Sequence, residues 1–501
     1  MTLLNVRRIL RLDFLILLPI LGLAFYIAFI PHQNYPYPLH VDEWFHLAYS
    51  KAMLQSGSTT FIEPFFGQAM IGLGSNLEAG FHLFWSIFQQ LSGISWMTIF
   101  RYFPSIIFII TVLSVYILAQ REGFGWEAAF FACLIPTTMG ILGPGFLVPV
   151  SIGMLFTPLS LFLAFNFRTV WAYLLIFIFI CFLLSIHAPS AICLIIVLTP
   201  YILLNLKGNF KHSLGITLAL ILPFLVISPW IFNMLLSTAK SLLTPQPPTE
   251  YVYLPPIIRT YGYLPSLFCL LGTFLLATRG NKQNYGLILG LLALLLMLVT
   301  FFTFHYGVPI IYERGLMYTM LMVSIVAGAG LMRVKNLRLP AKLSAWLKVP
   351  LITKNVGRFL CLALIGITLA ITIPSRLDTP YYHMIDRKDY QAFVWIKDNI
   401  NENYEKAILD PWKATAFTAI TDKNIYTRIH VITKAKDKEA YAFFESGSSN
   451  TTFLRENGIS IVYTRVSGGS EDFNIEYKSR NPDLVKVAEN TYLLKEAEKE
   501  E

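Results

Sequence analysis

The stretch LDFLILLPILGLAFYIAFIPHQNYPYPLHVDEWFHLAYSKAML, residues 12–54, joins a long apolar run to an adjacent pair of acidic residues, Asp42 and Glu43. The run near 13–31 is long enough to cross a bilayer as a helix. Acidic residues are scarce around it, because nine of the 30 lie in the first 374 residues and 21 in the remaining 127. Two acids side by side directly after the first predicted span therefore need an explanation.

The composition is that of a membrane protein with many spans. Of the 501 residues, 55% are hydrophobic and only 14% are charged, and the mean hydropathy is +0.57. A soluble protein of this length could not bury so much apolar surface. The net charge of +9 does not indicate nucleic-acid binding, because from residue 375 onward 18 basic residues face 21 acidic ones and the basic excess lies in the apolar part.

Hydropathy predicts a polytopic α-helical membrane protein with about eleven transmembrane helices. With a cytoplasmic N-terminus, the inner loops hold about 16 basic residues against about five in the outer loops, which fits the positive-inside rule. The first loop (32–96) and the C-terminus are then extracytoplasmic, in a multi-pass cell-membrane protein. The predicted spans lie near 13–31, 97–119, 124–142, 146–166, 169–187, 189–206, 213–237, 261–278, 284–304, 308–332 and 357–374.

The shift in composition at residue 375 predicts two domains, a transmembrane domain over 1–374 and a small extracytoplasmic α/β domain over 375–501. RKDYQAFVWIKDNI has apolar residues at helical spacing, whereas KAILD has the composition of a short strand. These segments are residues 387–400 and 406–410, followed by strands near 424–429, 460–466 and 490–494 and a helix near 437–457.

The first outer loop is predicted to contain two helices, over 41–55 and 77–92. Asp42 then has two compatible interpretations. It is the N-cap residue of the first helix, with Glu43 favourable in the first turn, or it is a carboxylate that takes part in chemistry at the membrane surface. A capping residue held in place can also serve as a catalytic group.

The pattern resembles the GT-C superfamily of membrane glycosyltransferases, which take a sugar from a polyprenyl-phosphate donor. The resemblance rests on DEWFHLA directly after the first helix, because protein O-mannosyltransferases, aminoarabinose transferases and oligosaccharyltransferase catalytic subunits carry a similar acidic motif there. The WWDYG motif of oligosaccharyltransferases would fall near Asp410–Lys413 and is absent, which leaves the acceptor open. Further similar stretches are EAGFHLFWSIFQQLSGIS (78–95), GPGFLVPVSIGMLF (143–156), LSIHAPSA (184–191) and YERGLMYTMLMVSIVAGAGL (312–331).

The resemblance implies transfer of a sugar from a polyprenyl-phosphate or pyrophosphate donor to a glycan, lipid or protein acceptor among the membrane lipids. Asp42 is the expected base, and Glu43 is expected to orient the acceptor or to share a divalent metal. An oxygen-rich pair of this kind suits Mg²⁺ or Mn²⁺. Some related mannosyl and arabinosyl transferases work without a metal, so the metal remains an open expectation.

The residues expected to contact the substrate lie toward the extracytoplasmic side, and most of them are arginines or histidines. Arg314, at the predicted outer start of a span, suits a phosphate because of its planar fork, although a structural ion pair is an equal alternative. His46 lies one helical turn after Asp42. The other candidates are Glu78, His82, His187, Arg259, His305 and Tyr306.

Two other function classes are compatible with the sequence. A transporter or flippase of lipid-linked sugars would more often carry ionisable residues inside its spans, or broken helices in two related halves, and neither pattern is evident. A non-catalytic membrane assembly protein would have no chemical need for the acidic pair. An in vitro transfer assay separates these classes.

Overall fold

The computed structural model describes residues 3–67, 69–138, 142–242, 244, 261–306, 309–338, 350–378, 381, 383–429, 434–467 and 474–495. The chain divides into two compact units, and each draws on two segments of the sequence. The first unit is Met1–Gln33 with Tyr102–Pro380, and the second is Asn34–Arg101 with Tyr381–Glu501. The first outer loop of the sequence prediction therefore belongs to the same compact unit as the C-terminal domain.

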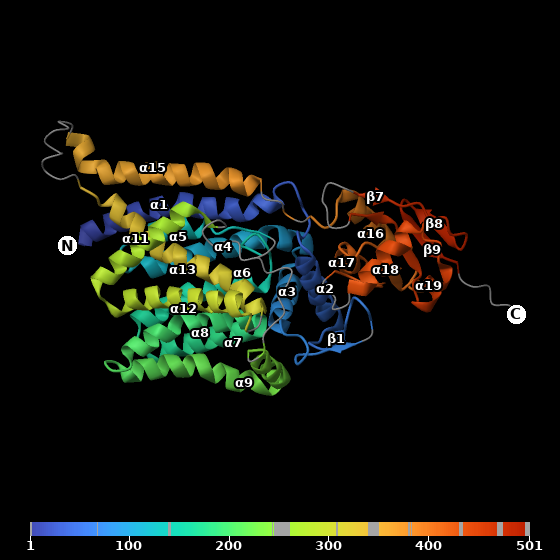
Figure 1. The fold of residues 1–501 in the computed structure, drawn as a ribbon, viewed down its shortest axis with the longest axis horizontal. Coiled ribbons are helices and arrows are strands. Elements are labelled where there is room, and N and C mark those ends of the chain that lie inside the picture. Colours follow the sequence, from blue (N-terminus) through green and yellow to red (C-terminus); the bar gives the residue numbers. More distant parts are fainter. Residues whose placement is uncertain are drawn as a thin grey trace. The chain divides into compact units, whose positions relative to one another are not determined.

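The first unit is a bundle of long apolar helices that run side by side (Figure 1). Eight helices in the described part of the chain are long and apolar enough to cross a membrane, and two apolar helices, α7 and α11, are shorter. The helices are α1 (Leu3–Phe29), α4 (Trp96–Gln120), α5 (Gly125–Ala132), α6 (Pro149–Asn166), α7 (Val170–Ile186), α8 (Ala188–Asn205), α9 (Phe210–Leu242), α11 (Tyr263–Arg279), α12 (Lys282–Phe304), α13 (Pro309–Lys335) and α15 (Pro350–Leu377).

Helix α13 forms the centre of this bundle. It packs against α5, α8, α11, α12 and α15, and the most apolar stretch of its span is wholly buried. Close packing depends on small residues in its AGAG sequence: a Cβ on Gly328 would lie 2.5 Å from the backbone nitrogen of Ala128 in α5. Small residues let helix backbones approach closely where no hydrophobic effect drives association in lipid.

Ten of the eleven predicted spans lie inside helices of the structure or extend beyond their ends by at most three residues. The prediction was wrong for 124–142, where Gly125–Ala132 is helical and the described residues 133–138 are turn and coil. Pro136 offers no backbone N–H for a helix. The hydroxyl of Thr137 accepts a hydrogen bond from the N–H of Gly145 at 2.8 Å, which stabilises the coil.

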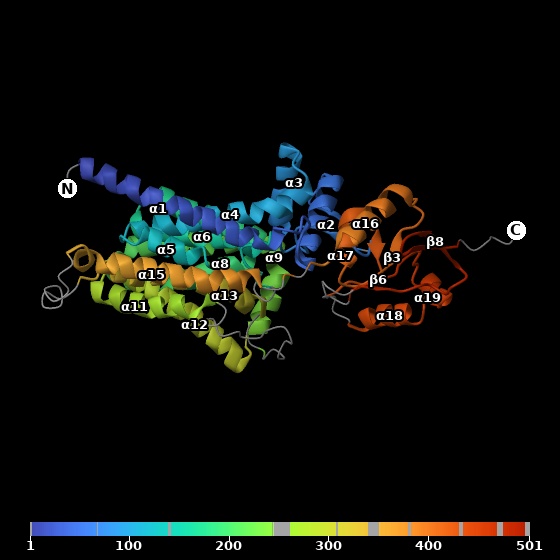
Figure 2. The same ribbon diagram turned by 90° about the horizontal axis from the view of Figure 1, so that it is seen from above.

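The second unit contains a three-layer α/β domain. Its main sheet has the strand order β4-β3-β5-β9-β8, parallel from β4 to β5 and antiparallel from β5 to β8. Figure 2 shows helices α16 and α17 on one face and α18 and α19 on the other. The bounds are α16 (Arg387–Asn399), β3 (Lys406–Ile408), α17 (Ala414–Thr421), β4 (Asn424–Ile425), α18 (Lys434–Glu445), α19 (Thr451–Glu456), β5 (Ile461–Tyr463), β8 (Leu484–Ala488) and β9 (Thr491–Leu494), with β6 (Arg465–Val466) and β7 (Ile475–Glu476) as a separate pair.

The side chains of β5 point alternately to the two faces of the sheet and contribute to an apolar core on each face. Val462 belongs to the apolar cluster with Phe444 of α18 and Leu454 of α19. Tyr463 points to the other face, where its ring contacts Phe393 of α16 at a centroid distance of 5.1 Å. Successive side chains of a strand point to opposite faces, so one short strand supplies both layers.

The loop segment of the second unit contains α2 (Val41–Ser56), the hairpin β1 (Phe61–Ile62) and β2 (Met70–Ile71), and α3 (Ala79–Ser92). Both helices were predicted, within two residues at each end. The N-cap interpretation of Asp42 was wrong. His40 holds that position in an extended conformation, and its Nδ1 accepts the N–H of Asp42 at 3.3 Å. Helix α2 packs against both α3 and α17.

Candidate functional site

The two acids of the DEWFHLA motif lie in different environments although they are adjacent. The side chain of Asp42 is 37% exposed, and its Oδ2 lies 3.7 Å from Nδ1 of His40. Glu43 is fully buried, and its Oε2 accepts the N–H of Leu39 at 2.5 Å. Asp42 is therefore the carboxylate of the pair that an external molecule can reach, whereas Glu43 stabilises the backbone that leads into α2.

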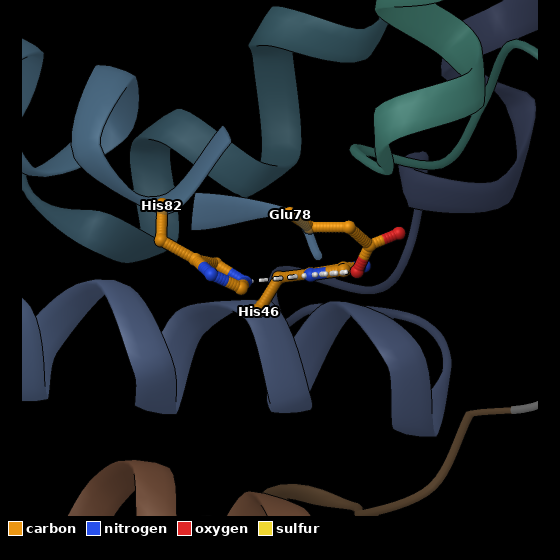
Figure 3. Close-up of side chains that lie close together, drawn as sticks. All are labelled: His46, Glu78 and His82. Carbon is orange, nitrogen blue, oxygen red and sulfur yellow. Dashed lines mark hydrogen bonds and ion pairs between the residues drawn. The ribbon is translucent and has the colours of Figure 1, made fainter. Parts of the chain in front are cut away.

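Helices α2 and α3 bring His46, Glu78 and His82 together, as Figure 3 shows. Nδ1 of His46 lies 3.0 Å from Nε2 of His82 and 3.8 Å from Oε2 of Glu78. One ligand atom from each residue falls within 4.8 Å of the others. The sequence prediction placed all three on the substrate side but did not group them.

Asn76 completes this cluster from the turn before α3. Its Oδ1 accepts the N–H of Glu78 at 3.2 Å, and its amide nitrogen lies 3.1 Å from Nδ1 of His82. The amide therefore donates to Nδ1, so the ring proton of His82 is on Nε2 and faces His46. Burial, and then the field of His46, hold the pKa of His82 well below its ordinary value, which keeps this ring neutral.

The donor set fits a divalent transition metal better than Mg²⁺ or Mn²⁺. Two imidazole nitrogens and one carboxylate oxygen are the ligands of zinc sites that keep an open position, whereas magnesium prefers oxygen ligands. To bind a metal through Nε2, His82 must carry its proton on Nδ1, which requires the Asn76 amide to turn its oxygen toward the ring. Among the described residues, His46, Glu78 and His82 are the single group of three that meets this ligand geometry. Metal binding by Asp42 and Glu43 remains a prediction.

The other predicted residues belong to the first unit, or lie outside the described residues in the case of Arg259. His187 is buried between α7 and α8, where its Nδ1 lies 2.6 Å from Oγ of Ser190. His305 ends α12 at φ +57° and is exposed, as is Tyr306. Arg314 is half-buried in the first turns of α13. Their substrate roles remain predictions.

A cation that the sequence analysis did not single out lies next to the aromatic side of α2. Arg428, three residues after β4, has its Cζ 5.2 Å from the ring centre of Phe45 and 5.0 Å from that of Phe65. No sequence signal identifies it, because the proximity depends on how the C-terminal domain folds against α2.

The second unit also has an open cavity of about 410 Å³ that is lined by aromatic and charged residues. Tyr35 stacks on His383 with ring centres 3.9 Å apart, and Tyr37 lines the same cavity. Asp386 and Lys413 add opposite charges to the wall. Lys413 belongs to the segment Asp410–Lys413, in which the sequence analysis found no WWDYG motif.

By sequence, the chain matches no protein-family model and no curated protein. By structure, it is similar to the oligosaccharyltransferase of Archaeoglobus fulgidus in its apo form, with a TM-score of 0.60, 12% identity, and coverage of 89% of this chain and 69% of that chain. The same enzyme, AglB, in complex with an inhibitory peptide and a dolichol-phosphate gives a TM-score of 0.58 at 13% identity, with 90% and 69% covered. A further structure of it contains Zn and sulfate.

ArnT from Cupriavidus metallidurans, bound to undecaprenyl phosphate, is similar over nearly its whole length. The TM-score is 0.57 at 13% identity, with 91% of this chain and 93% of that chain covered. These similarities confirm the predicted fold class, a polytopic α-helical membrane fold like those of AglB and ArnT, with an α/β region after the helices. The chain is a multi-pass membrane protein.

Proposed function

We propose that this protein is a membrane glycosyltransferase that moves a sugar from a polyprenyl-phosphate or pyrophosphate donor to an acceptor on the outer face of the membrane. The observation that carries the proposal is the accessible carboxylate of Asp42 at the start of α2, beside a fully buried Glu43, in a chain with the fold of AglB and ArnT. Structures of those two proteins hold dolichol-phosphate and undecaprenyl phosphate.

Asp42 acts as the general base in this proposal. Its carboxylate takes the proton of the acceptor hydroxyl or amide, and the acceptor atom bonds to the anomeric carbon of the sugar. The bond from that carbon to the phosphate oxygen breaks, and the lipid phosphate leaves with the electron pair. Attack on the side opposite the phosphate inverts the anomeric centre. The first loop and the C-terminal domain are extracytoplasmic, and the N-terminus is cytoplasmic.

His46, Glu78 and His82 are the residues that would hold a divalent metal, of the zinc class by their donor set. Support comes from the Zn-containing structure of the archaeal enzyme. When bound, such a cation supplies positive charge that stabilises a phosphate anion or an ionised group. The three side chains are buried or partly buried on α2, on α3 and at the N-cap of α3, and these helices pack together, so the side chains are held in place before any ligand arrives.

The transfer assay with Asp42→Asn tests the proposal. Defined polyprenyl-phosphate sugars are offered to the purified chain, and the loss expected for a general base is a factor of roughly 10² to 10⁴ with unchanged folding. Asp398→Asn, which removes an exposed carboxylate of α16, is the matched control and should transfer normally. No transfer by the wild type from any such donor, or normal transfer by Asp42→Asn, would reject Asp42 as the base.

The rival classes predict different results in the same preparation. A flippase would move the lipid-linked sugar between the leaflets of a vesicle without releasing the lipid phosphate. An assembly protein would do neither. A glycosyltransferase releases one lipid phosphate for each sugar transferred, so the two products are measured together.

A further inference from the structure

Arg428 has no bonded partner for its charge among the residues that the structure describes. Its side chain is half-buried, and Nε is buried with no hydrogen-bond acceptor. An arginine carries its charge at every physiological pH and has five N–H donors. A buried donor left without an acceptor costs free energy, and more so when it is charged. Nε of Arg428 therefore lacks an acceptor, which a bound anion would supply.

Two phenyl rings hold the guanidinium in place. Phe45 of α2 and Phe65 of the loop after β1 stack on each other, with centroids 5.6 Å apart and planes 11° apart, and Arg428 lies over both. Such cation–π contacts orient the side chain but satisfy none of its N–H groups. The stacked rings therefore orient the guanidinium group and leave its N–H groups available to a ligand.

The acids near Arg428 are either engaged elsewhere or act from a distance. Oε2 of Glu63 accepts the N–H groups of Phe65 and Phe66 at 3.1 and 2.7 Å. Burial lowers the pKa of Arg428, while Tyr49, Glu63 and Asp42 raise it, in that order. Burial raises the pKa of Tyr49 to about 12, so this hydroxyl is neutral at pH 7. In the described part of the chain no carboxylate forms an ion pair with Arg428.

We propose that Arg428 binds the phosphate of the lipid-linked donor, over the Phe45 ring at the N-terminal end of α2. The planar fork matches two phosphate oxygens, and hydrogen bonds between two charged groups are the strong ones. The phosphate would then lie at the same end of α2 as the carboxylate that takes the acceptor proton, and the cation would stabilise the charge that develops as the phosphate leaves. This inference rests on the proposed function.

The direct test measures phosphate binding without sugar transfer. Undecaprenyl phosphate and dolichyl phosphate are titrated into the purified full-length protein in detergent, and inorganic phosphate is titrated separately. Arg428→Gln should weaken binding on the order of ten- to a hundredfold, as expected for lost hydrogen bonds to a charged group. Arg428→Lys should weaken it less, because the charge stays but the fork is lost. Arg455→Gln, an exposed arginine of α19, should bind like the wild type.

Each outcome decides between a ligand role and a structural one. Competition by inorganic phosphate at millimolar concentration identifies the phosphate group itself as the ligand, and its absence identifies the whole lipid headgroup. Equal affinity of the wild type and Arg428→Gln, with a lower melting temperature for the variant, would show that Arg428 only braces Phe45 and Phe65 and would overturn the proposal. If Arg428→Gln does not fold, Arg428→Met keeps an apolar stem over the rings and is measured in its place. No binding of any probe by the wild type also overturns it.

Different results would reject the phosphate site at Arg428 and the transferase activity. Phosphate binding that depends on Arg428, combined with no sugar transfer from any donor, would reject the transferase and keep the phosphate site. Transfer that depends on Asp42 but not on Arg428 would reject the phosphate site and keep the transferase.

Discussion

Nδ1 of His46 and Nε2 of His82 lie 3.0 Å apart, although 36 residues separate them in the chain. Helices α2 and α3 pack against each other and place the two rings in one buried cluster with Glu78. A pair of buried rings this close either shares a proton or holds a cation. The difference between these two states can be measured.

We expect the purified protein to hold about one divalent metal ion, and His82→Ala to lose it. Removing one of three ligands leaves too few donors for a stable site. Metal content after dialysis is measured by mass spectrometry, with His383→Ala as the control because that ring stacks on Tyr35 outside the cluster. Wild type without metal, or equal metal in both variants, would mean that the two histidines only share a proton.

Asn76→Asp should strengthen the same site. A carboxylate at this position accepts the Nδ1 proton of His82 and leaves Nε2 free for the metal, as in carboxylate–histidine–zinc arrangements. Partners of this kind change metal affinity by roughly ten- to a hundredfold. The expected result is tighter retention of zinc against a chelator. Weaker retention than in the wild type would show that the present orientation of the amide is needed.

Glu43 should matter for stability rather than for chemistry. Glu43→Ala leaves the buried N–H of Leu39 without its acceptor, which costs roughly 1–3 kcal/mol. Glu43→Gln keeps an oxygen in place and should keep both stability and transfer. Melting temperature and transfer rate are measured on the same samples. A Glu43→Gln variant that is stable but as inactive as Asp42→Asn would make Glu43 part of the reaction.

Substitutions of Arg314 test whether this residue contacts the donor phosphate or has only a structural role. Arg314→Lys keeps the charge but loses the fork, so a phosphate role predicts a large loss of transfer with little change in melting temperature. Arg333→Lys, an exposed change near the other end of α13, is the control and should be neutral. Normal transfer in Arg314→Lys and Arg314→Ala, or unfolding of both, would assign the residue a structural role.

The sequence was sufficient where the signal is local. Apolar length identified ten of the eleven spans, and helical spacing identified α2 and α3. The sequence prediction was wrong where a single residue interrupts a helical pattern. The run 124–142 ends its helix before Pro136, and the predicted helix near 437–457 is two helices, α18 and α19, separated around Gly447 at φ +73°. The predicted strand near 460–466 is two short strands, β5 and β6, and strands β7 and β8 had no clear alternation of their own.

The site was only partly predictable for a different reason. Asp42, His46, Glu78 and His82 were identified one by one, because their residue types and positions point to chemistry. Their grouping depends on the packing of α2 against α3, which periodicity does not determine. Arg428 gave no signal, because its role depends on contacts with Phe45 and Phe65, far away in the sequence.

A partly buried ion-pair network at the start of α16 predicts that the stability of the C-terminal domain depends on pH. Arg465 donates two hydrogen bonds to Asp386, at 2.7 and 2.5 Å, and lies 2.9 Å from Asp389. Asp389, fully buried, also accepts from Lys413 at 3.0 Å and from Tyr463 at 2.7 Å. Burial alone would raise the pKa of Asp386, but Arg465 and the N–H of Asp389 hold it below its ordinary value.

A carboxyl whose pKa is lower in the folded state stabilises that state above its unfolded pKa, near 4, and loses the contribution as the pH falls through the folded pKa. Protection of the α16 amides from hydrogen exchange, corrected for intrinsic rates, should therefore decrease as the pH falls below about 4. Asp386→Asn keeps a good N-cap residue but removes the charge, so it should lower protection at pH 7 and flatten the decrease. Asp398→Asn, an exposed change on the same helix, should follow the wild type. A wild-type profile that is flat from pH 7 to 3, or an unchanged decrease in Asp386→Asn, would place the acid-sensitive contact elsewhere in the network.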